Sequence, residues 1–358
     1  MRNLYTTEEM MHLRRTGPCV VVIGGGTGLS NLLRGLKLAT HNITAVVAVS
    51  DDGGGSGSLR EDLGMLPPGD IRNCLLALAN TEPTLQQLLN YRFSDGSLAG
   101  QSFGNLFLAA LNGISGSFER AVARMNEVLA VTGRVLPVSC ADIRLEATFA
   151  DGSITLGESR IFDAKKRKKC RITRVRLRPE NPPPLPDVLD AIRNADLIVL
   201  GPGSLYTSVI PNLLVDGIAN AVAAASGLKI YVCNVMTQEG ETDGYTAYDH
   251  MRELLRHSRL DLVDLCLANN SYLPSYLLAQ YAREGAEPTV VDAHLFEAKG
   301  IELVPKPLAR AQGDFARHDA LKLTYALLTL LHERCPRPEP LADTDRRRLT
   351  WLEEQLPQ

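Results

Sequence analysis

Long apolar stretches are missing from this sequence: no run approaches the ~20 residues that a membrane-spanning helix needs, and the first sixteen residues are mainly polar. We therefore expect neither a membrane span nor a secretory signal. An excess of positive charge is also missing, since 38 Lys and Arg face 41 Asp and Glu, for a net charge of -3. This balance gives no reason to expect nucleic acid as a partner.

Paired cysteines are absent as well. The seven cysteines are scattered singly, with no CxxC pair, and the histidines show no HExxH spacing. This pattern favours reduced thiols in the cytoplasm over a disulfide framework or a zinc site. No internal repeat is present. What remains is 45% apolar and 22% charged residues, the composition of an ordinary soluble globular protein.

The first part of the chain predicts a βαβ unit. Residues 19–23 (CVVVI) and 43–49 (ITAVVAV) are short β-branched runs typical of buried parallel strands, and the leucines of 29–38 recur at helical spacing. Further strands are predicted at 196–200, 229–232 and 262–267, and helices at 71–79, 85–91, 106–111, 118–129 and 319–332. We therefore expect an α/β fold with a Rossmann-like, doubly wound, mostly parallel sheet.

The rest of the chain divides around this sheet. We expect an N-terminal extension at 1–17, an α/β domain at 18–334 and a peripheral, helical C-terminal tail at 335–358. Residues 134–186 alternate in polarity and end in Pro182-Pro183-Pro184, which predicts a β-rich insertion. Within it, the run Lys165-Lys166-Arg167-Lys168-Lys169 is most simply the solvated tip of a β-hairpin.

A glycine-rich turn, Gly24-Gly25-Gly26-Thr27-Gly28, joins the first strand to the first helix of this unit. Such a turn exposes backbone N–H groups at the positive end of the helix dipole, where a phosphate binds if no side chain obstructs it. The turn does not follow GxGxxG, since position 29 is leucine, and it lacks the Lys of GxxxxGK[ST]. A tight turn that needs positive φ is the alternative.

Two adjacent acids, Asp51 and Asp52, follow the second strand and precede a flexible Gly-rich loop. In a doubly wound sheet this loop lies at the carboxyl ends of the strands, facing the glycine turn. An acid there accepts a hydrogen bond from a ribose hydroxyl, as in NAD sites, or holds a divalent cation such as Mg²⁺ against phosphates. A solvated loop with capping aspartates is the alternative.

Further polar clusters lie after predicted strands or at helix starts. Asp70 is a candidate N-cap, and residues 201–208 (GPGSLYTS) repeat the pattern of an anion-accepting turn, with Tyr206 able to stack on a base or bond a sugar. Residues 234–242 are rich in donors and acceptors. Arg317 and His318 are candidates for phosphate or partner contact through charge-assisted bonds.

Together these segments resemble the YvcK proteins, known as gluconeogenesis factors, within the wider CofD-like group. The resemblance covers about 18–330 and rests on long motifs: VVIGGGTGLSNLLRGLK (21–37), AVVAVSDDGG (45–54), LPPGDIRNCLLALA (66–79), FGNLFLAAL (103–111), GPGSLYTSVIPNLLV (201–215), YVCNVMTQEGET (231–242) and RHDALKL (317–323). Gly55 and Ser58 depart from the expected DDGGSSGRLR, so that an arginine is missing at 58, for which Arg60 or Arg72 would substitute.

The resemblance implies a Rossmann-like fold, a UDP-sugar ligand, especially UDP-N-acetylglucosamine or UDP-glucose, and a role in cell shape and envelope carbon allocation on gluconeogenic carbon sources. A magnesium-dependent phospho-group transferase of the CofD kind and an NAD-binding protein are the alternatives. We also expect a homo-oligomer, a dimer. The expected ligand contacts are Gly24, Gly25, Gly26, Thr27, Gly28, Asp51, Asp52, Asn73, Asn105, Gly203, Ser204, Tyr206, Thr207, Asn234, Thr237 and Gln238.

Overall fold

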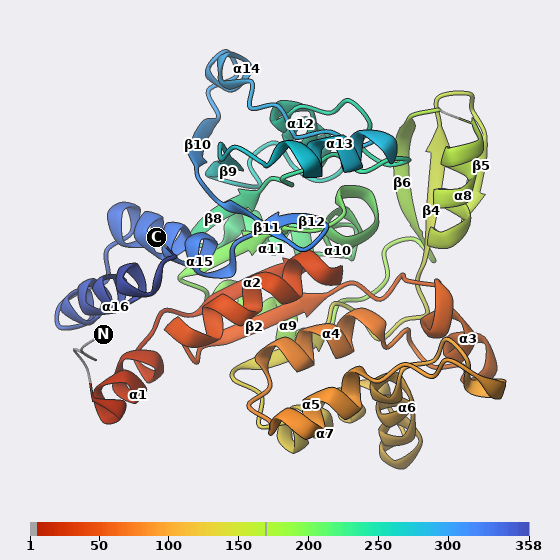
Figure 1. The fold of residues 1–358 in the computed structure, drawn as a ribbon, viewed down its shortest axis with the longest axis horizontal. Helices are drawn as coiled ribbons and strands as arrows, with labels where there is room; N and C mark the ends of the chain where they lie inside the picture. Colours follow the sequence, from red (N-terminus) through yellow and green to blue (C-terminus); the bar gives the residue numbers. More distant parts are fainter. Residues whose placement is uncertain (1–5, 169, 358) are drawn as a thin grey trace.

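The computed structural model describes residues 6–168 and 170–357, and its centre is a seven-stranded sheet (Figure 1). The strands are β1 (Val20–Gly24), β2 (Ile43–Val47), β3 (Arg134–Pro137), β7 (Leu197–Leu200), β8 (Leu228–Val232), β9 (Leu265–Asn269) and β10 (Glu302–Lys306). Every neighbouring pair is parallel, in the order β10-β9-β8-β7-β1-β2-β3. The strands β2 and β3 therefore follow β1 on one side of the sheet, and β8, β9 and β10 follow β7 on the other side. This confirms the doubly wound sheet and puts its topological switch point between β1 and β7.

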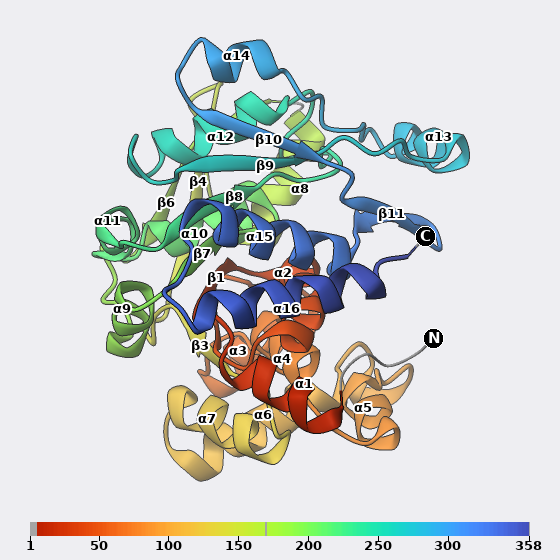
Figure 2. The ribbon, with the colours of Figure 1, turned by 90° about the vertical axis from the view of Figure 1, so that its left-hand side faces the viewer.

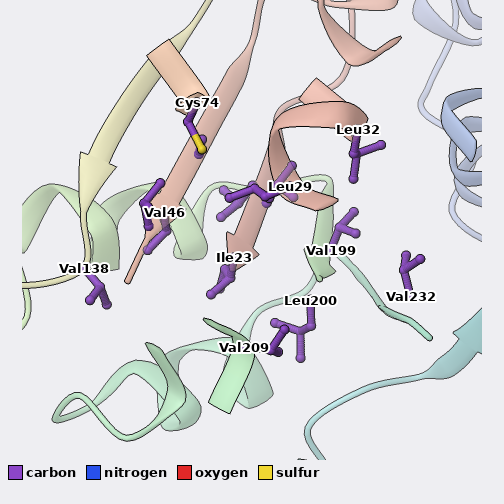
Figure 3. Close-up of a cluster of buried hydrophobic side chains, with 14 of the residues drawn as sticks. Ile23, Leu29, Leu32, Val46, Cys74, Val138, Val199, Leu200, Val209 and Val232 are labelled. Atoms are coloured by element: carbon purple, nitrogen blue, oxygen red, sulfur yellow. The ribbon is translucent and has the colours of Figure 1, made fainter. Parts of the chain in front are cut away.

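The central strands are buried on both faces, as their continuous apolar sequences predict. All five residues of β1 and of β2 are buried, and Ile23 lies in register with Val46 on one side and Leu200 on the other. Figure 3 shows these strands meeting Leu29 and Leu32 in one cluster. Burying each such side chain contributes about 1.5–3 kcal/mol, so this cluster fixes the strand ends that carry the loops.

Helices cover both faces of the sheet. Figure 2 looks onto the face covered by α2 (Gly26–Ala39) and α15 (Ala320–Arg334). These two helices cross closely at Gly35, where an added Cβ would lie 2.2 Å from the Ala320 carbonyl oxygen. The other helices of the α/β domain are α3 (Gly54–Leu63), α4 (Gly69–Leu78), α5 (Pro83–Asn90), α6 (Phe103–Ser115), α7 (Phe118–Val128), α9 (Pro186–Arg193), α10 (Ile210–Leu213), α11 (Ile218–Ala224), α12 (Ala247–Arg256), α13 (Ser275–Arg283) and α14 (Ala293–Glu297). A short 3-10 turn (Gly96–Leu98), a π turn (Leu205–Val209) and the hairpin β11 (Ala309–Gln312) and β12 (Phe315–His318) complete it.

The predicted helices and strands of the core are confirmed within a few residues at their ends. The Gly-rich segment after Asp52 is different: it was expected to be a flexible loop, but it forms the first turn of α3. Gly53 is the N-cap of this helix, and its backbone N–H donates to the Asp51 carboxylate at 2.9 Å.

The predicted β-rich insertion is smaller than residues 134–186. Its first strand, β3, belongs to the central sheet. The insertion is an antiparallel sheet of β4 (Arg144–Phe149), β5 (Ile154–Leu156) and β6 (Ile172–Arg178), in the order β5-β4-β6, with helix α8 (Glu158–Lys168) between β5 and β6. The basic run was therefore wrongly predicted as a hairpin tip, because residues up to Lys168 continue α8; Lys169 lies outside the described residues.

The two terminal segments pack on each other outside α15. Helix α16 (Leu341–Gln355) lies against α15 and α1 (Thr7–Arg15), as Figure 2 shows. Arg348 is 2% exposed and donates hydrogen bonds to the Leu13 carbonyl and to the Asp345 carboxylate. The tail is helical, as predicted, and a buried arginine holds it to the N-terminal helix.

Among the described residues, no single helix combines the length and apolar character of a membrane span. Within the same residues, the two helical segments Leu205–Leu213 and Ile218–Ala224 together reach the length and apolar composition of a span, but they are bent by 77° relative to each other.

Candidate nucleotide-binding site

Two glycine-containing loops meet at the switch point of the sheet. One joins β1 to α2, and the other follows β7. An added Cβ at Gly28 would lie 2.6 Å from the Pro202 carbonyl oxygen, and one at Gly203 would lie 3.1 Å from the Gly25 carbonyl oxygen. The glycines are therefore required by the close approach of the two backbones, and ligands bind at this crevice in open α/β sheets.

A pocket of about 500 Å³ opens between these loops, within the range of ordinary ligand sites. We call it the nucleotide pocket. Its lining combines both loops with the ends of β2 and β8 and with α4, α8, α13 and β12. The lining residues are Gly25, Gly26, Thr27, Gly28, Asn31, Asp51, Asp70, Glu158, Pro202, Gly203, Ser204, Thr207, Ser208, Asn234, Val235, Met236, Thr237, Gln238, Tyr281, Ala316, Arg317 and His318.

The N-terminus of α2 faces this pocket. Gly25 is the N-cap of the helix and has no side chain to satisfy its free N–H groups, and Gly26 adopts a φ of +68° that favours glycine. Thr27 and Gly28 belong to the first turn. The helix dipole and these N–H groups would suit an anion, and binding of phosphate at the glycine turn stays a prediction.

One of the free N–H groups at the α2 N-terminus already donates to a carboxylate of the protein. The Gly26 N–H donates to Asp70 Oδ2 at 2.7 Å. Asp70 does not cap α4 as predicted: Pro68 is the N-cap, and Asp70 lies in the first turn. From there its side chain reaches across to α2, so an added Cβ at Gly25 would lie 2.6 Å from Oδ2.

Three acids in the pocket have raised pKa values. Burial, followed by repulsion from Asp51, raises the pKa of Asp70 to about 6, although the Gly26 N–H opposes this shift. Burial also raises the pKa of Asp51, against the Gly53 N–H. Burial together with the charges of Asp51 and Asp70 raises the pKa of Glu158 well above its usual range. A diphosphate entering this pocket would therefore meet negative charge unless protons or a cation neutralise it.

Asp52 explains how Glu158 reaches the pocket. The Asp52 carboxylate accepts hydrogen bonds from the backbone N–H and the hydroxyl of Ser159, at 2.8 Å and 2.7 Å. This ties the insertion to the end of β2. Asp52 itself does not line the pocket, so the predicted pairing of Asp51 with Asp52 on one cation is not formed. Within the described ranges, no group of three or more Asp, Glu, His or Cys side chains is placed to hold a metal ion.

The second loop differs from the predicted anion-accepting turn. The backbone N–H groups of Tyr206 and Thr207 donate to Glu241 Oε1, at 2.7 Å and 3.2 Å. The Gly203 N–H points to Asn234 Oδ1 at 3.4 Å. These three donors are thus satisfied within the protein.

Tyr206 is fully buried and lies away from the pocket. Its hydroxyl is 2.9 Å from that of Tyr245 and donates to Glu253 Oε2 at 3.1 Å. The predicted contact of this ring with a base or sugar is therefore wrong. The apolar run around residue 206, which continues into α10, explains its burial.

Gly24, Asn73 and Asn105 are also outside the pocket lining. The Gly24 carbonyl accepts hydrogen bonds from Ala48 and Asn212, which fix the end of β1. Asn73 accepts from Arg72 at 2.6 Å, and Asn105 is buried on α6. None of these three residues lines the pocket.

Neither arginine expected to replace the one missing at 58 reaches the pocket. Arg60 is buried and binds the Asp142 carboxylate and the Ile143 carbonyl. Arg72 is buried and binds Ser102 and Asn73. Among the described residues that line the pocket, Arg317 on β12 is the one arginine or lysine.

The last wall comes from segments far along the chain. Arg317 and His318 line the pocket, as expected for ligand contact, and Tyr281 on α13 joins them. Burial lowers the pKa of His318 to about 4, so its ring is neutral at pH 7 and cannot supply the charge that the sequence suggested. Asp70, Glu158, Ser208 and Tyr281 were not foreseen as site residues. Glu158 and Tyr281 lie outside the motifs, whereas Asp70 and Ser208 lie inside two of them.

The chain is similar to known proteins over most of its length. The family model described as 2-phospho-L-lactate transferase CofD matches residues 20–309. Relatives named gluconeogenesis factor include that of Halalkalibacterium halodurans, 49% identical over 86% of this chain and 95% of its own, and that of Bacillus subtilis, 46% identical over 88% and 99%.

The fold comparison agrees with these matches. A crystal structure of a Bacillus halodurans protein of the UPF0052 family superposes with a TM-score of 0.83 at 48% identity, covering 86% of this chain and 99% of that one. Together with the two glycine loops at the switch point, these matches show that the chain belongs to the CofD-like family, in the branch of the gluconeogenesis factors, the YvcK proteins.

Proposed function

We propose that the nucleotide pocket binds a uridine diphosphate sugar, with UDP-N-acetylglucosamine as the first candidate. We further propose that the protein is a regulatory protein that acts through binding this ligand, without catalysing a reaction. The observation that carries this proposal is the meeting of the α2 N-terminus with the loop after β7 at the switch point. There the diphosphate would lie against Thr27, Gly28 and Arg317.

The rest of the lining suits the two ends of such a ligand. Asn31, Ser204, Asn234 and Gln238 offer amides and hydroxyls for sugar hydroxyl groups, although Gln238 already donates to Ser204 at 2.9 Å. Val235, Met236 and Tyr281 offer an apolar, aromatic wall for the base. In the cell, the proposed role is the one the family resemblance implies, in envelope carbon allocation and cell shape. The dimer, the cytoplasmic location and an unidentified protein partner stay predictions.

A calorimetric titration with UDP-N-acetylglucosamine, with and without Mg²⁺, tests the proposal. Saturable binding that weakens about tenfold or more in Arg317→Gln supports it, since a charged hydrogen bond to phosphate is lost. Arg124→Gln, an exposed arginine on α7, is the matched control. Absence of binding at millimolar ligand contradicts the proposal. Displacement by NAD in the same assay would assign the pocket to a dinucleotide instead.

The acids of the pocket favour a second candidate, a magnesium-dependent phospho-group transfer of the CofD kind. Asp51 and Asp70 are oxygen ligands of the type that Mg²⁺ shares with phosphates, and Mg²⁺ commonly binds through one or two carboxylates. When bound, it would neutralise phosphate charge. Turnover of a nucleotide-linked donor that requires Mg²⁺ and falls by orders of magnitude in Asp51→Asn supports transfer. Binding without turnover leaves the regulatory function.

A further inference from the structure

A second pocket, of about 510 Å³, lies beside the nucleotide pocket. We call it the arginine cavity. It is bounded by the outer face of α2, the β11–β12 hairpin, the start of α15 and the end of α16. Its lining residues are Thr27, Ser30, Asn31, Arg34, Gly35, Leu38, Arg310, Gln312, Arg317, Asp319, Ala320, Leu321, Gln355 and Pro357. Thr27, Asn31 and Arg317 also line the nucleotide pocket, so the two pockets share a wall.

Positive charge dominates this cavity. Its ionisable side chains are Arg34, Arg310 and Arg317, against the single carboxylate of Asp319. Across residues 6–168 and 170–357, Arg34 makes no ion pair or hydrogen bond through its side chain. Arg317 lies over the Phe315 ring at 4.9 Å, which leaves its planar N–H groups available. Guanidinium groups gathered in this way match the geometry and charge of a phosphate.

Asp319 adds an unsatisfied acceptor. Its side chain is 3% exposed, and Oδ1 caps α15 by accepting from the N–H groups of Leu321 and Lys322, at 3.0 Å and 3.1 Å. Oδ2 has no hydrogen-bond partner among the described residues; its nearest cation is Arg310 Nη1, at 3.5 Å. A buried acceptor without a donor is costly, so a ligand hydroxyl at this position would be favoured.

We propose that the arginine cavity binds a phosphorylated sugar or polyol as a second ligand, separate from the nucleotide sugar. Its phosphate binds Arg34, Arg310 and Arg317, and one of its hydroxyls donates to Asp319 Oδ2. Ser30 and Gln312 offer further polar contacts. Because Arg317 belongs to both pockets, each ligand alters the affinity of the other.

Part of this cavity comes from residues beyond the end of the CofD family model at residue 309, although Arg317 and Asp319 belong to the RHDALKL motif. Arg310, Gln312, Arg317 and Asp319 follow residue 309, Gln355 is the last residue of α16, and Pro357 lies just beyond this helix. The tail thus completes the cavity wall. This gives α16, and the α1 contacts that hold it, a role in ligand binding.

The test is a calorimetric titration of glucose 6-phosphate, with inorganic phosphate and glucose as comparison probes, into protein with and without saturating UDP-N-acetylglucosamine. We expect saturable binding of glucose 6-phosphate in both states, and no binding of glucose. The double variant Arg34→Gln/Arg310→Gln weakens this binding about tenfold or more. It retains UDP-N-acetylglucosamine binding, because neither residue lines the nucleotide pocket.

The double variant Arg124→Gln/Arg283→Gln is the control, because it removes the same net charge from two exposed arginines elsewhere. Asp319→Asn keeps a capping side chain and is expected to reduce the preference for glucose 6-phosphate over inorganic phosphate. The proposal is overturned if glucose 6-phosphate does not bind, or if it binds equally well to Arg34→Gln/Arg310→Gln. Either result is independent of whether UDP-N-acetylglucosamine binds, so this proposal and the proposed function fail separately.

Discussion

The Asp70 carboxylate accepts the Gly26 N–H at 2.7 Å, so an acid of the protein occupies part of the helix N-terminus that would bind phosphate. Burial and the nearby Asp51 charge hold the pKa of Asp70 at about 6. The helix N-terminus thus attracts an anion, whereas the carboxylates of Asp70 and Asp51 repel one. Protons or a cation at Asp70 would resolve this conflict, and binding should depend on both.

Asp70→Asn is expected to stabilise the protein at alkaline pH. The pKa of Asp70 is raised from 3.8 to about 6 in the folded state, so its ionisation destabilises the fold progressively as pH rises from about 4 to about 6. At about 1.4 kcal/mol per pKa unit, the full cost above pH 6 is about 3 kcal/mol. The variant should gain about 2–3 kcal/mol at pH 8 and little at pH 4, measured by urea unfolding. Exposed Asp314→Asn is the control, and an equal gain at both pH values would refute the assignment.

Affinity for UDP-N-acetylglucosamine without Mg²⁺ is expected to rise as pH falls from 8 to 5.5. Protonation of Asp70, whose pKa is raised to about 6, removes negative charge from the path of the diphosphate. With saturating Mg²⁺ the dependence should flatten, because the cation supplies the same neutralisation. Calorimetry across this pH range measures both curves. A metal-free affinity that is independent of pH would show that the Asp70 carboxyl does not face the ligand.

Gly28→Ala is expected to separate the two loops. The new Cβ would lie 2.6 Å from the Pro202 carbonyl oxygen, a backbone atom that cannot move aside alone. We expect a loss of about 1–3 kcal/mol in the free energy of unfolding and weaker nucleotide-sugar binding. Gly113→Ala is the matched control: this helical glycine has nothing within 4 Å of an added Cβ, so alanine should stabilise α6 by about 0.5–1 kcal/mol. Equal effects of the two substitutions would contradict the predicted contact.

Arg348→Ala is expected to release the terminal helices. It leaves the buried Leu13 carbonyl without this donor, while the Asp345 carboxylate keeps its bonds to Arg337, so we expect a loss of about 1–3 kcal/mol. Hydrogen exchange should rise in Thr7–Arg15 and Leu341–Gln355 and not in the central sheet. Arg347→Ala, whose pair with Asp343 is exposed, is the comparison and should have little effect. Unchanged exchange in both helices would show that Arg348 does not hold them.

The sheet was predictable because each central strand has a short, continuously apolar sequence. Runs such as Val20–Gly24 are apolar on both faces, and this alone predicts a parallel strand covered by helices. The glycine turn and the acids after β2 followed from the same topology, since strand ends gather at one edge.

The side-chain directions were not predictable in the same way. Tyr206 and Thr207 adjoin in a polar motif, yet the Tyr206 ring turns into the core to meet Tyr245 and Glu253 while Thr207 lines the pocket. Glu158 lines the pocket next to Ser159, which binds Asp52, a contact between residues 107 positions apart. Such long-range contacts leave no periodic signal in one sequence.

A crystal structure of the complex with UDP-N-acetylglucosamine tests the central claim most directly. We predict the diphosphate at the start of α2, against Thr27, Gly28 and Arg317, with the loop after β7 on its other side. A ligand bound elsewhere, for example with its diphosphate in the arginine cavity and the nucleotide pocket empty, would contradict the account.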